Sequence, residues 1–250
     1  MKTHLSYFAL LLISLTGGAG VSLPVSADQM LATESALVRV VEEPGWNMGA
    51  RLHFDRRQYD TDAARVDTDI RQLVARLGIR LAPSLHVWGD LGAAEADVES
   101  NRGGAGLVWG IGAGLSVFEY AMQASPVVGS KELLSLEIEG SYRDAESDFN
   151  EDRTLTWQDA RVATIIAYRI NSLGEQEQRP FDPSGYALRA GPVYTRVSGE
   201  FDGTDFEHTN EFGALFGADI RMNSGWLVRA EFIWLGRDNR EFSLGAHRYF

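Results

Sequence analysis

Apolar and polar side chains alternate with a period of two along most of this chain, and the alternation leaves few folds open to it. In residues 226–235, Trp226, Val228 and Ala230 share one face while Arg229 and Glu231 share the other. Successive side chains of a β-strand point to opposite sides of the sheet, so a period of two indicates strands. After the first 27 residues there is no apolar run near the ~20 residues that a membrane helix needs. The chain is therefore predicted to be all-β.

Ten segments show this alternation, and polar links or tight turns separate them. They cover residues 46–55, 69–81, 85–98, 107–120, 133–143, 154–170, 186–197, 212–222, 226–235 and 241–250. The Gly110-Ile-Gly-Ala-Gly114 run resembles a phosphate-binding loop, but it alternates and no helix follows. We therefore interpret its glycines as small residues that leave room inside a sheet. Pro192 cannot donate to a ladder, which predicts a bulge in its strand.

The links between the segments fall into two alternating kinds. Longer links, much of whose charge is acidic, cover residues 60–68, 99–104, 144–153, 200–210 and 236–240, and short turns cover 82–84 and 223–224. Residues 171–184 are a longer exception among the short turns. An even strand number with long links at one end is typical of a closed, antiparallel up-and-down transmembrane β-barrel. We predict ten strands, with eight or twelve as alternatives.

The last strand and the general pattern resemble small outer-membrane barrels of Gram-negative bacteria, the group that includes OmpA-like, OmpW-like and opacity-type proteins. Those barrels commonly end in Gly-x-x-aromatic-x-Phe. Gly245 and Phe250 match, whereas Arg248 occupies the inner aromatic position and Tyr249 stands beside it. The resemblance covers residues 46–250 by pattern, without a family-specific motif. It implies an outer-membrane location at the cell surface, contact with lipid and lipopolysaccharide, and an assembly machinery that recognises Gly245, Tyr249 and Phe250.

Aromatic residues at the ends of the apolar stripes are candidates for the two interfaces of the membrane, where such barrels carry aromatic girdles. The candidates are Trp46, Phe54, Trp226, Trp234 and Phe250.

The first 27 residues read as a cleaved secretory signal peptide. Lys2 gives a basic start, residues 7–15 form a short apolar core, and Val25-Ser-Ala27 resembles a cleavage site. Residues 28–45 are then a periplasmic lead-in or a plug of the lumen, and residues 46–250 form the barrel.

Removal of residues 1–27 takes away one cation and no acid, which leaves 22 basic and 35 acidic residues and a charge of −13. Nucleic acid is excluded as a partner of so acidic a chain. With no cysteine there is neither a disulfide nor a thiolate metal site.

The polar face of the strands is predicted to line the lumen with nearly balanced charge. Its members are Arg51, Arg76, Arg80, Arg143, Arg161, Arg169, Arg189, Arg221 and Arg229, with Asp55, Asp90, Glu137, Glu139, Asp159, Asp219 and Glu231. Eight strands make a barrel that its own side chains fill, and open channels appear at ~16–18 strands. A ten-stranded lumen with paired charges is therefore predicted to be largely plugged.

These patterns support three functional hypotheses. The first is a non-enzymatic outer-membrane barrel with a structural or surface-interaction role, whose acidic loops contact a surface ligand or partner protein. The second is a narrow porin-like channel for small solutes. The third is an outer-membrane hydrolase, but the Asp-x-His pair of the omptins is not matched by Asp205 and His208, and His86 lacks the serine of lipid A deacylases. No cofactor or metal is predicted, because residues 144–153 lack the glycine and spacing of an EF-hand loop.

Overall fold

The structure, a computed structural model, describes residues 45–60, 65–98, 101–122, 130–150, 153–172, 180–201, 204–207, 211–236 and 239–250. The predicted signal peptide and nearly all of the predicted lead-in therefore lie outside the described residues and stay predictions. Among the described residues there is no helix long and apolar enough to cross a membrane.

Every regular element of the described chain is a β-strand. The strands are β1 (Trp46–Asp60), β2 (Arg65–Ala82), β3 (Leu85–Val98), β4 (Asn101–Met122), β5 (Ser130–Asn150), β6 (Arg153–Ser172), β7 (Pro183–Phe201), β8 (Thr204–Glu207), β9 (Glu211–Met222), β10 (Trp226–Trp234) and β11 (Arg240–Tyr249).

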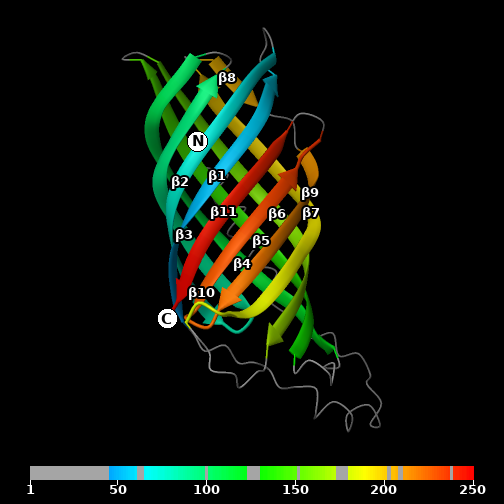
Figure 1. Cartoon of the computed structure of the whole chain (residues 1–250). Coiled ribbons are helices and arrows are strands. Elements are labelled where there is room, and N and C mark those ends of the chain that lie inside the picture. Colours follow the sequence, from blue (N-terminus) through cyan, green and yellow to red (C-terminus); the bar gives the residue numbers. More distant parts are fainter. Residues whose placement is uncertain are drawn as a thin grey trace. The chain divides into compact units, whose positions relative to one another are not determined.

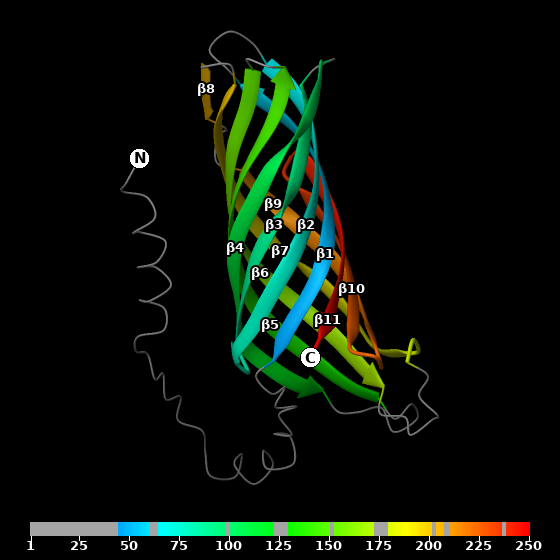
Figure 2. The same cartoon turned by 90° about the vertical axis from the view of Figure 1, so that its left-hand side faces the viewer.

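Ten of these strands close into an antiparallel barrel in up-and-down order. With β8 left aside, each strand pairs with the strands before and after it in the chain, including β6 with β7. The first strand, β1, pairs with the last, β11, so the ring has no free edge. Figure 1 shows the blue β1 beside the red β11, and Figure 2 shows the strongly tilted strands of the wall from another side. The predicted all-β barrel of ten strands is confirmed. The remaining strand, β8, lies outside this ring of ten and forms a short hairpin with the end of β7.

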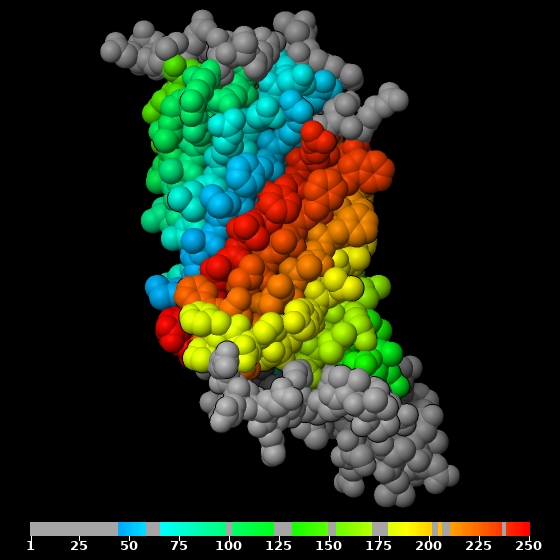
Figure 3. Space-filling view, in the orientation of Figure 1, coloured from blue at the N-terminus to red at the C-terminus, as the bar shows by residue number. Residues whose placement is uncertain are grey.

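The seam between the first and last barrel strands is continuous. Ten residue pairs join β1 to β11, from Asn47 opposite Tyr249 to Arg56 opposite Arg240. Beyond this ladder the amide of Phe250 donates to the carbonyl of Trp46 at 2.9 Å. In the space-filling view β1, β11 and β10 form an unbroken wall (Figure 3). Closure satisfies the backbone hydrogen bonds at what would otherwise be two exposed sheet edges.

Apolar side chains cover the outside of the barrel and form what we call the apolar band. Its members include Met48 and Leu52 of β1, Leu73 and Leu77 of β2, Leu91 of β3, Leu107 and Ile111 of β4, Val162 and Ile166 of β6, Leu188 of β7, Phe216 of β9, Phe232 of β10 and Leu244 of β11, all exposed. The register places these residues in rows, as Leu244, Leu52 and Leu73 show on three adjacent strands. A large exposed apolar surface of this kind marks contact with lipid or another apolar partner.

Several strands continue well beyond the apolar band at the upper end of the barrel, which is the end where β1 meets β2 and β5 meets β6. The prediction was wrong there. Residues 144–150 were expected in a loop and lie in β5, and residues 101–104 lie in β4. Residues 65–68 belong to β2, and the expected link 200–210 contains the end of β7 and all of β8.

The physical reason is an inversion of the pattern. Above the band, apolar residues such as Leu155 and Trp157 point inward while Thr156 and Gln158 point outward, as in a water-soluble barrel. The strand continues, but the face that carries its apolar residues changes.

The predicted bulge at Pro192 is also wrong. Ala163 pairs with Val193 and Ile166 pairs with Ala190, so the β6–β7 register is the same on both sides of the proline. The pairs between these two are missing from that ladder, which is the effect expected of a residue without an N–H donor.

Candidate functional site

The middle of the barrel interior holds several groups of ion pairs, which together we call the lumen charge network. It comprises Arg51, Arg57, Arg76, Arg161, Arg189 and Arg229 with Asp55, Asp90, Glu137, Glu139, Asp159, Asp219, Glu231 and Glu241. These residues come from nine strands, and each occupies an inward position of the alternation.

Arg189 of β7 is the centre of the network. Its guanidinium lies 2.5 Å from Glu231, 2.5 Å from Glu139 and 3.4 Å from Glu137, and its side chain is 1% exposed. Arg229 binds Asp219 through two hydrogen bonds of 2.9 Å and lies 3.8 Å from Glu139. One buried cation thus faces three carboxylates, and the neighbouring arginine shares one of them.

A second group surrounds Glu241 at the start of β11. Arg161 of β6 pairs with Glu241 and lies 3.3 Å from Asp159. Arg57 lies 2.7 Å from Asp55 and 3.4 Å from Asp159. The Nδ1 atom of His53 lies 3.2 Å from the same Glu241. Glu241 and Asp159 each face more than one donor, which helps to compensate the desolvation of these charges.

Arg51 belongs to the group around Arg189, since it pairs with Glu231, and it also donates to the hydroxyl of Ser243 on β11 at 2.8 Å. Arg76 forms a bidentate pair with Asp90, with both hydrogen bonds at 2.7 Å. The guanidinium of Arg76 also lies 4.8 Å from the ring centroid of Trp88. The bidentate and stacked contacts are specific to arginine and orient the group.

Of the remaining residues predicted for the lumen, Arg80, Arg169 and Arg221 lie toward the lower end, whereas Arg143 is opposite Asp159 at the level of the network. Arg169 pairs with Glu137 and lies 3.8 Å from Glu119, and its side chain is 34% exposed. Arg80 lies 5.9 Å from the ring centroid of Tyr249. Arg221 is half-buried next to the end of β9. Arg143 donates to Gln72 at 2.9 Å.

Sequence reasoning missed Arg57 and Glu241 as members of the network. Arg57 was left out because the first strand was expected to end at residue 55, whereas β1 continues to Asp60. A signal was present, because residues 51, 53, 55 and 57 continue one polar face. Glu241 begins its strand, and only its pairing across the seam places it beside His53 and Arg161.

An apolar cluster fills the interior above the network, and we call it the upper core. It contains Ile70, Val74, Ala94, Ala96, Val98, Val108, Ala145, Leu155, Trp157, Val197 and Phe206, all buried. Val66, Phe149 and Phe201 pack against it. The interior therefore changes from charged in the middle to apolar at the upper end.

The glycines of β4 make room for aromatic side chains of β3. A Cβ atom on Gly112 would overlap the ring of Trp88, and one on Gly114 would overlap His86. Trp88 and His86 stack at 5.1 Å between ring centroids. The interpretation of Gly110, Gly112 and Gly114 as space inside a sheet agrees with this packing, since the run lies wholly within β4.

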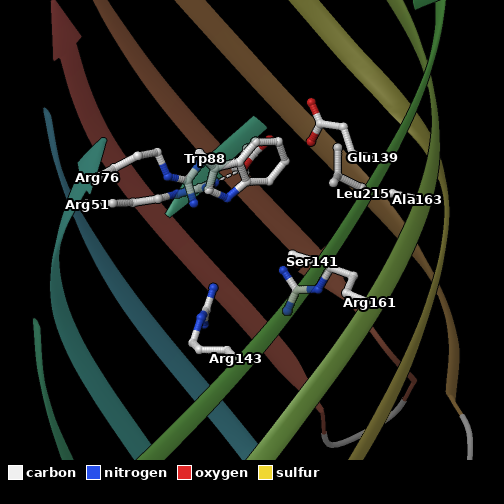
Figure 4. Close-up of a pocket in the computed structure, with 10 residues that line it drawn as sticks. Arg51, Arg76, Trp88, Glu139, Ser141, Arg143, Arg161, Ala163 and Leu215 are labelled. Atoms are coloured by element: carbon white, nitrogen blue, oxygen red, sulfur yellow. Dashed lines mark ion pairs between the residues drawn. The ribbon is translucent and has the colours of Figure 1, made fainter. Parts of the chain in front are cut away.

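A small cavity of about 30 Å³ remains within the network. It is lined by Arg51, Arg76, Trp88, Glu139, Ser141, Arg143, Arg161, Ala163, Leu215 and Glu231. Figure 4 shows the guanidinium groups of Arg51, Arg76, Arg143 and Arg161 turned toward this space, with Trp88 beside Arg51. This volume is enough to hold a water-sized occupant and is well below the ~150 Å³ of a cavity that holds benzene. The cavity is too small for a sugar or an amino acid.

The aromatic candidates for the interface all lie on outward positions of the wall. Trp46 and Trp226 begin β1 and β10 at the lower end, while Phe54 and Trp234 lie eight residues further along the same strands. Eight residues at ~3.3 Å each span ~26 Å of strand, or about 20 Å across a membrane after a tilt of ~40°. Phe250 is 66% exposed, and the guanidinium of Arg248 lies 5.1 Å from its ring centroid.

The histidines of β1 and β11 lie apart on the wall. His53 and His247 lie on paired strands, but His53 is opposite Ser243 and His247 is opposite Gly49, four residues further along. His53 is 2% exposed and lies buried in the interior. Within the described ranges there is no group of three or more histidines and carboxylates arranged to hold a metal ion. Of the rejected omptin-like pair, His208 lies outside the described residues.

No protein-family model matches the chain. No curated protein matches it. Several solved structures are similar to parts of it at low identity. The translocator domain of the autotransporter NalP from Neisseria meningitidis is 12% identical, with 89% of this chain and 94% of that chain covered and a TM-score of 0.39. Neisserial surface protein A is 11% identical, with 82% and 95% covered and a TM-score of 0.33. An outer membrane channel from Pseudomonas putida F1 is 12% identical, with 85% and 98% covered and a TM-score of 0.33. Because these TM-scores are below 0.5, the fold and the site rest on the geometry described above.

Proposed function

We propose that the protein is an integral outer-membrane β-barrel whose interior is closed, and that it works in the membrane and at the cell surface without catalysing a reaction. The observation that carries the proposal is the opposite character of the two faces of the wall. Apolar side chains cover the outside, and paired charges fill the inside at the same level.

The outside supports a membrane location. In a bilayer a β-structure must close on itself, because no water is present to bind free backbone groups. The described barrel has no free edge, and its apolar band is flanked at the upper end by exposed charges. Three exposed ion pairs lie there on adjacent strands: Arg56 with Asp69, Arg71 with Asp97, and Arg102 with Glu95.

Lipid and lipopolysaccharide are the partners that this exterior favours. The apolar band suits acyl chains, and the guanidinium groups of Arg56, Arg71 and Arg102 lie just beyond it, where phosphate groups of the outer leaflet would be. The last strand, with Gly245, Tyr249 and Phe250, is the segment that we propose an assembly machinery recognises. The acidic upper end is the surface offered to a soluble ligand or partner protein.

The inside supports a closed lumen. The network crosses the barrel through Glu231, which pairs with Arg51 of β1 and Arg189 of β7. The upper core then fills the space above it with apolar side chains. A solute would have to displace both, and the cavity within the network admits one small molecule or ion.

The test is single-channel conductance of the refolded barrel in planar bilayers, with heat-modifiable gel mobility as the control for folding. We expect folded protein that gives no discrete openings. Reproducible openings of the wild-type barrel would contradict the closed lumen and favour the alternative, a narrow porin-like channel for small solutes.

The same measurement on Arg161→Ala and Arg229→Ala tests which side chains close the path. Both arginines bridge strands of the network, so their loss is expected to produce measurable openings. Arg102→Ala is the control, because Arg102 is exposed on the outside of the wall. If the two lumen variants fold and stay as silent as Arg102→Ala, the network does not close the path.

A further inference from the structure

The cavity within the lumen charge network carries an excess of positive charge. Four guanidinium groups and two carboxylates line it. Arg51, Arg76 and Arg161 each pair with a carboxylate, namely Glu231, Asp90 and Glu241. Arg143 has no carboxylate within ion-pair distance among the residues that the structure describes, and it donates a hydrogen bond to the neutral Gln72.

An arginine inside a barrel cannot escape this imbalance by losing its proton, because its pKa lies too far above neutrality. Arg143 is half-buried, so its uncompensated charge carries part of the cost of burial, and the usual remedy is a counter-ion of opposite sign. The position of Arg143 on β5 therefore points to a missing negative charge on the cavity side of its guanidinium, which Figure 4 shows turned toward Arg51 and Trp88.

Three further donors at the same cavity are buried and have no hydrogen-bond acceptor. They are the Nε atoms of Arg51 and Arg161 and the indole Nε1 of Trp88. All three groups can only donate, so they can be satisfied by an acceptor and not by each other. Buried donors without partners are rare in folded proteins and indicate an occupant, which is either a water molecule or an anion.

We propose that this cavity is a binding site for one small inorganic anion of the size of chloride, held by Arg143, Arg51, Arg161 and Trp88. The volume of about 30 Å³ excludes larger anions such as sugar acids. The charge distinguishes an anion from water, because water leaves the guanidinium of Arg143 uncompensated. The bound ion stabilises the barrel and closes the remaining space in its middle. This inference does not depend on the membrane location or on the surface role proposed above.

Bromide is the probe, because it replaces chloride and gives an anomalous X-ray signal. Crystals of the folded barrel grown in sodium bromide are expected to show one anomalous peak between Arg143 and Trp88. In solution, the thermal unfolding midpoint is expected to rise with bromide and not with gluconate at the same ionic strength. A water molecule in the cavity, or bromide at surface positions only, overturns the proposal.

Arg143→Gln is the decisive variant, since glutamine keeps a donor and removes the charge. The bromide concentration that gives half of the stabilisation is expected to rise at least about tenfold, the effect of losing one hydrogen bond to a charged group. Arg102→Gln, on the outer surface, is expected to keep the wild-type response.

If Arg143→Gln does not fold, Trp88→Phe removes one donor while keeping an aromatic ring, and a weaker bromide response is expected there too. An unchanged response in a folded variant of either residue overturns the assignment of the site.

Discussion

At the scale of single residues, the lumen is held together by shared carboxylates. Glu231 pairs with both Arg51 and Arg189, and Glu139 pairs with both Arg189 and Arg229. Glu241 contacts both Arg161 and His53. Sharing matters because a buried ion pair is favourable only when the remaining donors and acceptors are satisfied. Removal of one arginine therefore leaves several carboxylates with one cation fewer.

Arg189→Gln tests this dependence. The substitution leaves Glu137, Glu139 and Glu231 facing one another with one cation fewer, and we expect a loss of roughly 3–5 kcal/mol in the free energy of unfolding. Urea unfolding of the refolded barrel in lipid vesicles measures it. Arg102→Gln removes an exposed arginine from the outer surface and is expected to change little. Equal losses in the free energy of unfolding for the two variants would contradict the stabilising role of the buried pairs.

At the scale of elements, strands of the barrel carry two different surfaces along their length. In β6 the outward Ile166 and Val162 belong to the apolar band, whereas the outward Thr156 and Gln158 lie above it. The packing between β3 and β4 also differs along their length. In the lower half of β4, glycines lie opposite the aromatic residues of β3 and make room for their rings.

Ile166→Arg and Thr156→Arg, both on outward positions of β6, test the proposed position of the membrane. An arginine near mid-depth in lipid costs ~2–4 kcal/mol, and the cost falls to ~0–1 kcal/mol near the interface. We expect Ile166→Arg to lower the free energy of unfolding from lipid vesicles by the larger amount, and Thr156→Arg to leave it almost unchanged. Similar values for both would place the membrane elsewhere on the wall.

Gly112→Ala tests the packing of β3 against β4. The new methyl group overlaps the ring of Trp88, so either the ring leaves Arg76 or the strands shift. Overpacking of this kind typically costs ~1–3 kcal/mol. We expect a lower free energy of unfolding and a shifted tryptophan emission. Gly89→Ala is the matched control on β3, because its Cβ meets nothing closer than 3.9 Å. An undisturbed emission spectrum in Gly112→Ala would contradict the described packing.

At the scale of the whole molecule, the barrel depends on one seam between strands that are far apart in sequence. β11 pairs with β10 on one side and with β1 on the other, so the last strand completes both the wall and the interior network. Phe250 lies just past the end of β11, is exposed, and its amide binds the carbonyl of Trp46. Its side chain therefore lies on the outer surface, next to the seam.

Phe250→Ala tests the proposed role of the last residue in assembly. We expect much less folded barrel in the outer membrane of cells, while refolding of purified protein into detergent keeps its normal yield. Phe242→Ala on the same strand removes an outward aromatic that stacks on Phe54 at 6.4 Å, and it is expected to weaken the folded barrel without that selective loss in cells. Normal assembly of the Phe250→Ala variant in cells would contradict the proposed role of Phe250.

Much of this molecule could be predicted from the alternation alone. A period of two assigns each side chain to one of two faces, so ten strands, the outward apolar residues and the inward arginines follow from the sequence. The prediction failed above the apolar band, where residues 144–150 lie in β5 although their pattern suggested a loop. There the apolar residues change face, and polarity no longer marks the strand.

What the sequence by itself determined is therefore the type of element and the face of each residue. Only the tertiary structure decided which inward residues meet. Arg161 reaches Glu241 and Arg51 reaches Glu231 because the strands tilt and close in one register, which brings together residues 80 and 180 positions apart. The alternation is the same in every register that keeps the faces, so it leaves the partners open. The upper core, the cavity and the uncompensated charge of Arg143 all arise from that closure.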